Sequence, residues 1–225
     1  MNIKAVRDPC VPTGAIRQKP QILSVRTAAR SRLFHIESVQ LKFANGSRRE
    51  FERIAAGPRA GTALVVAMPD PATVLLVREY AVGLDRFELS LPMGRIEPGE
   101  SAIAAANREL MEETGFSAGN MRPLHTLTLA PGILGYQAEV FLATELTPCA
   151  LGGDEPEPLE LVYWPIARLD QVATTGEISE ARTLSSLFLA RSILASWRSL
   201  PICTTPLAQC AGGVGQHGLR PPSDA

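Results

Sequence analysis

The sequence is poor in cysteine, long apolar segments and net charge, and each absence argues against a class of protein. The four cysteines, Cys10, Cys149, Cys203 and Cys210, include no Cys-x-x-Cys pair, which disfavours a zinc site and a disulfide framework and fits a reducing compartment. No run approaches the roughly 20 apolar residues of a membrane helix, and residues 1–20 lack the apolar core of a signal peptide. With a net charge of −1, the chain has no strong positive electrostatic field that would attract nucleic acid or an anionic membrane. We therefore expect a cytoplasmic protein with neither partner.

The composition nevertheless supports a packed core. Of the 225 residues, 45% are hydrophobic and 20% are charged. The length is enough for one large domain or for one domain with an added module. Composition and turn residues predict four parts: a flexible leader at 1–20, a small antiparallel β-unit at 21–57, a main domain at 58–199 and a disordered tail at 200–225. Gly57-Pro58 marks the predicted boundary between the β-unit and the main domain.

The β-unit is predicted from alternation around a turn. Val39, Leu41 and Phe43 alternate with polar neighbours, and Asn45-Gly46 follows before a second run over 48–54. Asn-Gly between such runs favours a type I′ hairpin, because both residues tolerate positive φ.

The main domain mixes strands and helices. The sequence predicts a hairpin from 62–68 and 73–77 around Asp70-Pro71, further strands at 87–92, 123–129, 137–143 and 159–164, and a loop over 94–99. Helices are predicted at 101–114, capped by Ser101 and ended by Gly115, and at about 179–197. This pattern indicates an α+β fold or an α/β/α sandwich.

The first predicted helix gathers carboxylates on one face. Glu109 stands three residues before Glu112 and four before Glu113, so the three are neighbours on a helix, and like charges so placed repel by about 0.2–0.5 kcal/mol per pair. The stripe predicted to be buried beside them is Ile103, Ala106 and Leu110. A hard divalent cation would relieve the repulsion. Taken alone, the three glutamates fit a solvated acidic face with an Arg108–Glu112 pair better.

The wider pattern reverses that balance. Gly94 is followed after five residues by Glu100, and after seven more by Arg108-Glu109-Leu110-Met111-Glu112-Glu113-Thr114-Gly115-Phe116. This segment resembles the Nudix box with no departure in residue type or spacing. The resemblance implies a Nudix fold, a mixed β-sheet between helices, and hydrolysis of a pyrophosphate linked to a nucleoside.

The resemblance also implies roles for the residues of the box. Glu109 and Glu113 are the first-choice metal ligands, Glu112 is a further one, and the backbone carbonyl of Met93 or Gly94 adds another. Glu100 and Arg108 brace the loop against the helix, and Gly115 ends it. The expected cofactor is Mg²⁺, with Mn²⁺ left open. Such an ion neutralises phosphate oxygens and lowers the pKa of a bound water, and a general base takes the proton of that water.

Similarity extends beyond the box. Residues 21–34, 76–83, 153–159 and 180–189 resemble the NudE-type ADP compounds hydrolases, so the likeness covers about residues 19–198. Pro131, fifteen residues beyond Phe116, resembles the marker proline of ADP-ribose pyrophosphatases. These families imply a small-molecule nucleotide substrate such as ADP-ribose, NADH or a diadenosine polyphosphate, with AMP and the other phosphorylated half as products. They also imply a homodimer in which residues 21–57 exchange.

The resemblance places the catalytic base in an acidic loop. Glu155 is the expected base and Glu157 its helper or an extra metal ligand, while the alternative is an exposed turn; Glu112 is the next candidate for the base. Arg78 is expected to bind phosphate through its fork of donors, although a surface charge is as consistent. Tyr80 is a candidate to stack on a base, and packing explains it equally well.

Two departures leave the substrate open. Ala81 stands where ADP-ribose pyrophosphatases carry arginine after the aromatic residue, whereas Leu91-Pro92-Met93 is closer to that family than to the NudE type. A Nudix pyrophosphatase for a nucleotide sugar is the alternative enzyme. A non-catalytic Nudix-like sensor is disfavoured, because every box carboxylate is present and residues 1–57 are predicted to form strands without a basic helix.

Overall fold

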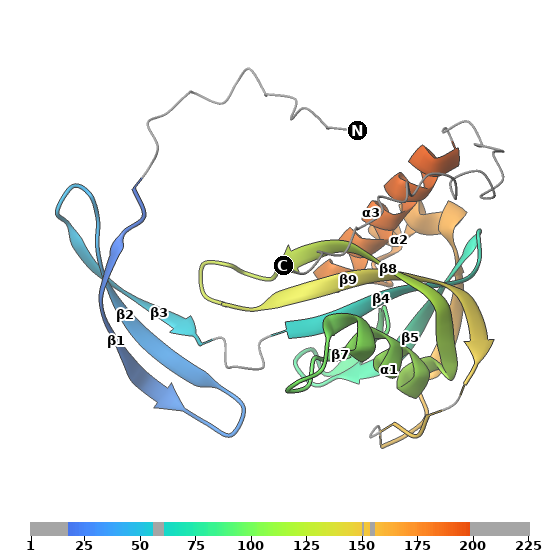
Figure 1. The fold of residues 1–225 in the computed structure, drawn as a ribbon, viewed down its shortest axis with the longest axis horizontal. Helices are drawn as coiled ribbons and strands as arrows, with labels where there is room; N and C mark the ends of the chain where they lie inside the picture. Colours follow the sequence, from blue (N-terminus) through green and yellow to red (C-terminus); the bar gives the residue numbers. More distant parts are fainter. Residues whose placement is uncertain (1–17, 56–60, 150, 154–155, 199–225) are drawn as a thin grey trace, which may run out of the picture.

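The computed structural model describes residues 18–55, 61–149, 151–153 and 156–198. These residues form a three-stranded sheet and a larger sheet that lies between helices (Figure 1). The predicted tail at 200–225 and nearly all of the predicted leader lie outside the described residues. Gly57 and Pro58, the predicted boundary, lie outside them too.

The small sheet contains β1 (Gln21–Arg30), β2 (His35–Lys42) and β3 (Arg48–Ile54), paired antiparallel in that order. It meets the larger domain where the amide of Ile54 donates to the carbonyl of Ile133 at 2.8 Å. Every residue of β1 is exposed, including Ile22 and Val25, which are 49% and 45% exposed.

The turn between β2 and β3 differs from the predicted type I′ form. That form needs positive φ at both central residues, but only Gly46, with φ 83°, has it, and Asn45 does not. The amide of Gly46 donates to the carbonyl of Phe43, and the Asn45 side chain accepts the amide of Ser47. The prediction was wrong because the Asn45 side chain stabilises a turn one residue longer, with the glycine at its left-handed end.

The larger sheet runs in the order β10-β5-β4-β9-β8. Its strands are β4 (Gly61–Asp70), β5 (Thr73–Ala81), β6 (Arg86–Ser90), β7 (Met93–Arg95), β8 (Phe116–Thr128), β9 (Gln137–Pro148) and β10 (Glu160–Pro165). The sheet is mixed, because β4 and β9 are parallel and the other pairs are antiparallel. The expected mixed sheet between helices is therefore confirmed.

Strand β7 replaces the start of a segment predicted to be a loop. Leu64 pairs with Met93 and Ala63 with Gly94, on the edge of β4 that β5 shares. The prediction of a loop over 94–99 was wrong at Gly94 and Arg95 and is confirmed over 96–99. At the first two residues, pairing with a buried strand outweighs the low strand propensity of glycine.

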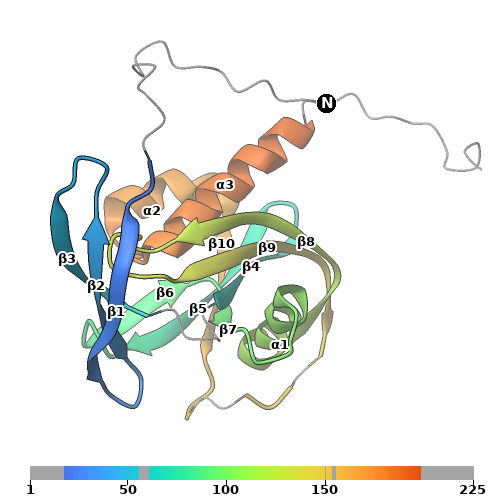
Figure 2. The same ribbon diagram turned by 60° about the vertical axis from the view of Figure 1, so that its left-hand side comes forward.

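Helices cover both faces of the sheet (Figure 2). Helix α1 (Ala102–Thr114) lies on one side, and the 3₁₀ turn η1 (Ile166–Arg168), α2 (Leu169–Thr175) and α3 (Ala181–Arg198) lie on the other. The sequence missed α2, which is too short to show a helical period. No helix in the described part of the chain is long and apolar enough to cross a membrane.

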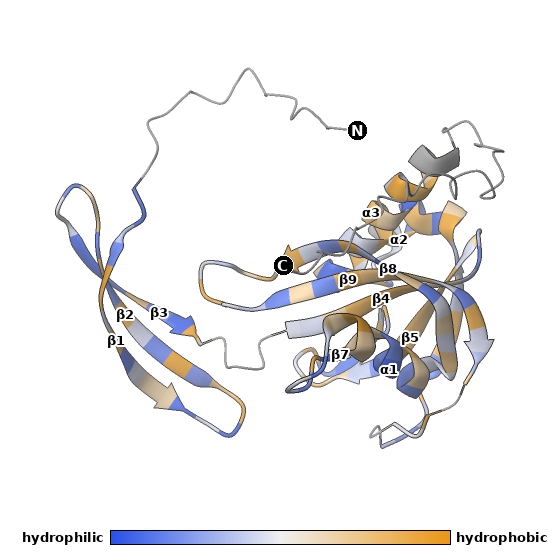
Figure 3. Cartoon of the chain, in the orientation of Figure 1, coloured by the Kyte–Doolittle hydropathy of each residue, from blue (hydrophilic) through white to orange (hydrophobic). Residues whose placement is uncertain are grey.

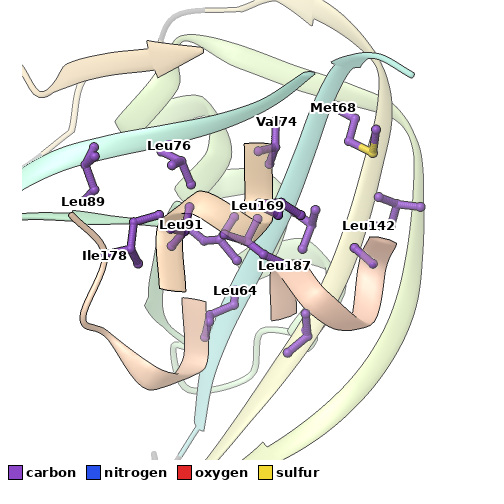
Figure 4. Close-up of a cluster of buried hydrophobic side chains, with 14 of the residues drawn as sticks. Leu64, Met68, Val74, Leu76, Leu89, Leu91, Leu142, Leu169, Ile178 and Leu187 are labelled. Carbon is purple, nitrogen blue, oxygen red and sulfur yellow. The ribbon is translucent and has the colours of Figure 1, made fainter. Parts of the chain in front are cut away.

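Strand β4 supplies both layers of the core. Its side chains alternate, so Ala63 and Val65 pack toward α1 while Leu64 and Val66 pack toward α2 and α3. Burial on both faces explains why the strand is almost continuously apolar (Figure 3). In the second layer, Leu169, Ile178 and Leu187 lie over the strands (Figure 4).

Candidate active site

Helix α1 has local signals at both ends. The Ser101 side chain accepts the amide of Ala104 at 3.3 Å, and Gly115, at φ 72°, donates to the carbonyl of Met111 at 3.0 Å. The side chains that face the sheet are Ala105, Ala106, Leu110 and Thr114. Ile103, which the sequence placed in the buried stripe, is 45% exposed, because Ala105 rather than Ile103 faces the sheet.

Gly94 on β7 lies directly against Glu109 on α1. A Cβ at Gly94 would lie 1.9 Å from the Cδ of Glu109 and about as close to both carboxylate oxygens. No side chain fits there while Glu109 keeps its position. The glycine at the start of the box thus allows a strand backbone to touch a half-buried carboxylate.

Arg108 holds the surrounding carboxylates. Its Nε and Nη2 donate to the two oxygens of Glu100 at 3.0 and 3.1 Å, and Nη2 also donates to the carbonyl of Arg95. Its Nη1 donates to Glu109 at 2.7 Å and to Glu112 at 2.9 Å. Hydrogen bonding from Arg108, opposed by burial, holds the pKa of Glu100 below its ordinary value. The same contacts raise the pKa of Arg108, which therefore stays charged.

Glu113 turns toward β7, where it accepts the amide of Met93 at 3.2 Å. The three helix carboxylates are thus divided between Arg108 and the backbone of β7. In this arrangement no group of three His, Cys, Asp or Glu side chains among the described residues converges on one point. The donor set nonetheless suits a hard cation, because half-buried carboxylates border a glycine backbone.

A pocket of about 490 Å³ opens beside the end of β5. It is lined by Arg78, Glu79, Tyr80, Val82, Phe87, Pro156, Glu157, Pro158 and Leu159. Arg78 donates from Nε to Glu160 at 3.1 Å. The Tyr80 and Phe87 rings meet edge to face with centroids 5.6 Å apart. The Tyr80 hydroxyl donates to Asp85, which raises the pKa of the tyrosine.

One loop links this pocket to the carboxylates. A Cβ at Gly153 would lie 3.5 Å from the Cβ of Glu112, so the loop passes along α1, and after Asp154 and Glu155 it lines the pocket through Glu157. Glu155, the predicted base, lies outside the described residues. Glu157 is exposed and shares the pocket with Arg78 and Tyr80.

Sequence reasoning did not single out Phe87 or Glu160. Both lie opposite predicted site residues, since Phe87 pairs with Tyr80 across β5 and β6, and Glu160 pairs with Arg78 across β5 and β10. Strand alternation alone could not give the register of Glu160 with Arg78, because the pairing of β10 with β5 joins distant segments.

Two family models match the chain. The model of the NUDIX domain matches residues 58–185, and that of the NudE-type Nudix hydrolase N-terminal domain matches residues 20–53. The chain belongs to the Nudix hydrolases, enzymes that generally need a divalent metal ion. The resemblance found in the box is therefore confirmed.

Individual relatives narrow this class. The chain is 46% identical to the ADP compounds hydrolase NudE of Escherichia coli (strain K12) over 177 residues, which are 79% of the chain and 94% of that protein. It resembles a crystal structure of an ADP compounds hydrolase with a TM-score of 0.77 and 43% identity, covering 83% of this chain and all of that one. An ADP-ribose pyrophosphatase of Bacillus subtilis (strain 168) is 27% identical, covering 72% of the chain and 89% of that protein. The similarity to NudE-type enzymes thus spans both sheets.

Proposed function

We propose that the chain hydrolyses the pyrophosphate of ADP-linked compounds such as ADP-ribose, NADH and diadenosine polyphosphates, releasing AMP and the other phosphorylated half. The observation that carries the proposal is the contact of Gly94 with Glu109, which joins the first residue of an intact box to the carboxylates of its helix. The loop that passes Glu112 at Gly153 continues to a pocket lined by Glu157. The pocket volume lies within the usual range for small ligands, roughly 300–1,000 Å³. The similarity to NudE supports the ADP moiety.

The proposed cation is Mg²⁺, with Mn²⁺ as a substitute. Glu109 and Glu113 would hold it, with Glu112 and the carbonyl of Met93 or Gly94 as further donors. Arg108 Nη1 would then give up at least one carboxylate, while its bonds to Glu100 keep the guanidinium in place. A bound cation supplies neutralisation of phosphate charge and a more acidic water.

Glu155 is the proposed general base, with Glu157 as helper. The support is positional, because the loop passes Glu112 at Gly153 and lines the pocket at Glu157. Glu155 stands between these two points in the sequence. A carboxylate there would be able to take a proton from a water held above α1.

Arg78 and Tyr80 are proposed to bind the substrate. Glu160 holds Arg78 by Nε, and the terminal nitrogens make no hydrogen bond to a described residue, so both can meet phosphate oxygens. Tyr80 and Phe87 offer an aromatic surface for adenine in the same pocket.

We also propose a homodimer built through the small sheet. Its strand β1 leaves Ile22 and Val25 about half exposed. A three-stranded sheet is stable only when its apolar face is packed, and a second copy of the chain would cover these side chains. Light scattering should give a molar mass twice that of the chain, and the Val25→Glu variant should give a mass closer to that of the monomer. A monomeric wild-type protein would reject this proposal. A cytoplasmic location stays a prediction from the cysteine pattern.

The activity is tested with a panel of ADP compounds and a nucleotide sugar in Mg²⁺. Glu113→Gln and Glu155→Gln are compared with Glu177→Gln, an exposed control outside the site. Both site variants should lose turnover while the control keeps it. Hydrolysis of the sugar nucleotide alone would reject the ADP class. Full rate in Glu155→Gln would reject the base and make Glu112 the next candidate.

A further inference from the structure

The first turn of α3 begins with an unusual cap. Glu180 precedes the helix, and its carboxylate accepts the amides of Arg182 at 3.2 Å and of Thr183 at 2.7 Å. Shorter side chains are the usual caps. Burial opposes the charge of Glu180, but hydrogen bonds from Arg182 and Thr183 outweigh it and lower its pKa. The longer glutamate therefore remains a carboxylate inside the fold.

The extra reach of Glu180 serves the hydroxyl of Thr183. Thr183 is fully buried, and its hydroxyl donates to Glu180 at 2.9 Å while it accepts the amide of Leu91 at 3.1 Å. A hydroxyl has one proton to donate, so the carboxylate directs that proton away from Leu91. The oxygen lone pairs then face the Leu91 amide.

Leu91 starts the short segment that becomes β7. The carbonyl of Pro92 accepts the amide of Val65 at 2.9 Å, and the amide of Met93 donates to Glu113 at 3.2 Å. Gly94 then lies against Glu109. Four consecutive residues are thus fixed in turn by α3, by β4 and by two carboxylates of α1.

From these contacts we propose that Glu180 and Thr183 are positioning residues that set the place of the Met93–Gly94 backbone relative to Glu109 and Glu113, and so tune metal binding from the opposite helical layer. The proposal rests on the proposed function of those two glutamates. It gives a role to the segment 180–183, which the box chemistry leaves unused.

The competing explanation is that Thr183 only satisfies a buried amide. Ser186 offers a matched control, because it is also fully buried on α3 and its hydroxyl has no hydrogen-bond partner among the described residues. Thr183→Val and Ser186→Ala each remove one buried hydroxyl. Only the first of them breaks the path from Glu180 to Leu91.

The test measures Mn²⁺ affinity by calorimetry without nucleotide. It also measures kcat for ADP-ribose hydrolysis and the Mg²⁺ midpoint, which is the Mg²⁺ concentration that gives half of the maximal rate. Thr183→Val should weaken Mn²⁺ binding about tenfold, the low end for residues that orient metal ligands, and raise the Mg²⁺ midpoint similarly. Ser186→Ala should match the wild type, and Thr183→Ser should restore it. Glu180→Gln, which leaves the hydroxyl in place but loses the charge that orients it, should shift the same quantities if Thr183→Val does not fold.

Two outcomes separate the possible failures. A wild-type protein that neither binds Mn²⁺ nor hydrolyses ADP-ribose would overturn the proposed function and this inference with it. A wild-type protein that does both, with Thr183→Val or Glu180→Gln equal to Ser186→Ala in metal affinity and midpoint, would overturn the positioning role alone.

Discussion

The carboxylate of Glu109 occupies the space that a side chain at Gly94 would need. This contact joins β7 to α1 and brings a backbone that can offer a carbonyl next to a proposed metal ligand. Gly94 and Glu109 lie on different elements, yet the position of the β7 backbone and the position of the Glu109 side chain depend on each other. The residues of the box therefore pack β7 against α1, in addition to supplying the proposed metal ligands.

Gly94→Ala should abolish most activity. The new methyl group would displace Glu109 or β7, and a shift of about 1 Å near the reacting groups can lower the rate about 100-fold. Steady-state kcat/KM with ADP-ribose in Mg²⁺ measures the effect. Gly132→Ala is the control, because nothing lies within 4 Å of a Cβ at that position. Equal activity in the two variants would show that the contact has no part in hydrolysis.

Arg108→Gln should destabilise the protein and make it depend more on metal. The change leaves Glu109 and Glu112 without a shared cation, and loss of charged hydrogen bonds costs about 1.5–3 kcal/mol. Urea unfolding with and without Mg²⁺ should show a larger metal stabilisation than in the wild type. Arg191→Gln breaks an exposed pair with Asp170 and should cost under about 1 kcal/mol. Equal stability losses would contradict the proposed function of Arg108.

Acid should remove part of the stability through Glu100. Its pKa in the folded state lies below the ordinary value of 4.5, so its stabilisation is fully present above that value and is lost as pH falls through the folded pKa. Glu100→Gln should therefore be less stable than the wild type at pH 7, and the difference should shrink below about pH 4. Urea midpoints across this range measure it. A difference that stays constant with pH would mean that the charge of Glu100 is not involved.

Tyr80→Ala should weaken substrate binding more than it slows the chemical step. Stacking of a base on an aromatic ring contributes about 1–3 kcal/mol, so KM should rise roughly 5- to 150-fold with a smaller change in kcat. Tyr80→Phe loses only the contact with Asp85 and should stay near the wild type. Tyr163→Ala removes another exposed tyrosine that does not line the pocket. A KM for Tyr80→Ala like that of Tyr163→Ala would exclude stacking.

The sequence predicted best what neighbouring residues decide. Helix α1 has its cap, its alanines and its terminal glycine within one short segment, so its limits were found almost to the residue. Strand β7 depends on its partner β4 elsewhere in the chain, and propensity does not contain that information. The prediction for the turn after β2 failed for a local reason, since the side chain of Asn45 stabilises a longer turn than the one predicted.

The candidate site divides in the same way. The spacing of Gly94, Glu100 and the Arg108-Glu109 pair was legible in the sequence. The Arg108–Glu112 pair was predicted from its spacing of four residues, and the structure confirms it. That the same nitrogen would also hold Glu109 was not predicted, because it depends on side-chain conformations that the pattern leaves free. Glu160, which holds Arg78, was missed because two strands distant in sequence bring the pair together.

The parallel pairing of β4 with β9 determines the order in which the chain can assemble. During synthesis β4 leaves the ribosome long before its neighbour at Gln137–Pro148, so one whole edge of the most apolar strand must wait for later residues. The small sheet needs nothing beyond Ile54 to pair its own strands and can form first. The nascent protein thus carries the paired strands of the small sheet while one edge of β4 still lacks its partner, and unpaired apolar edges of this kind are prone to aggregation.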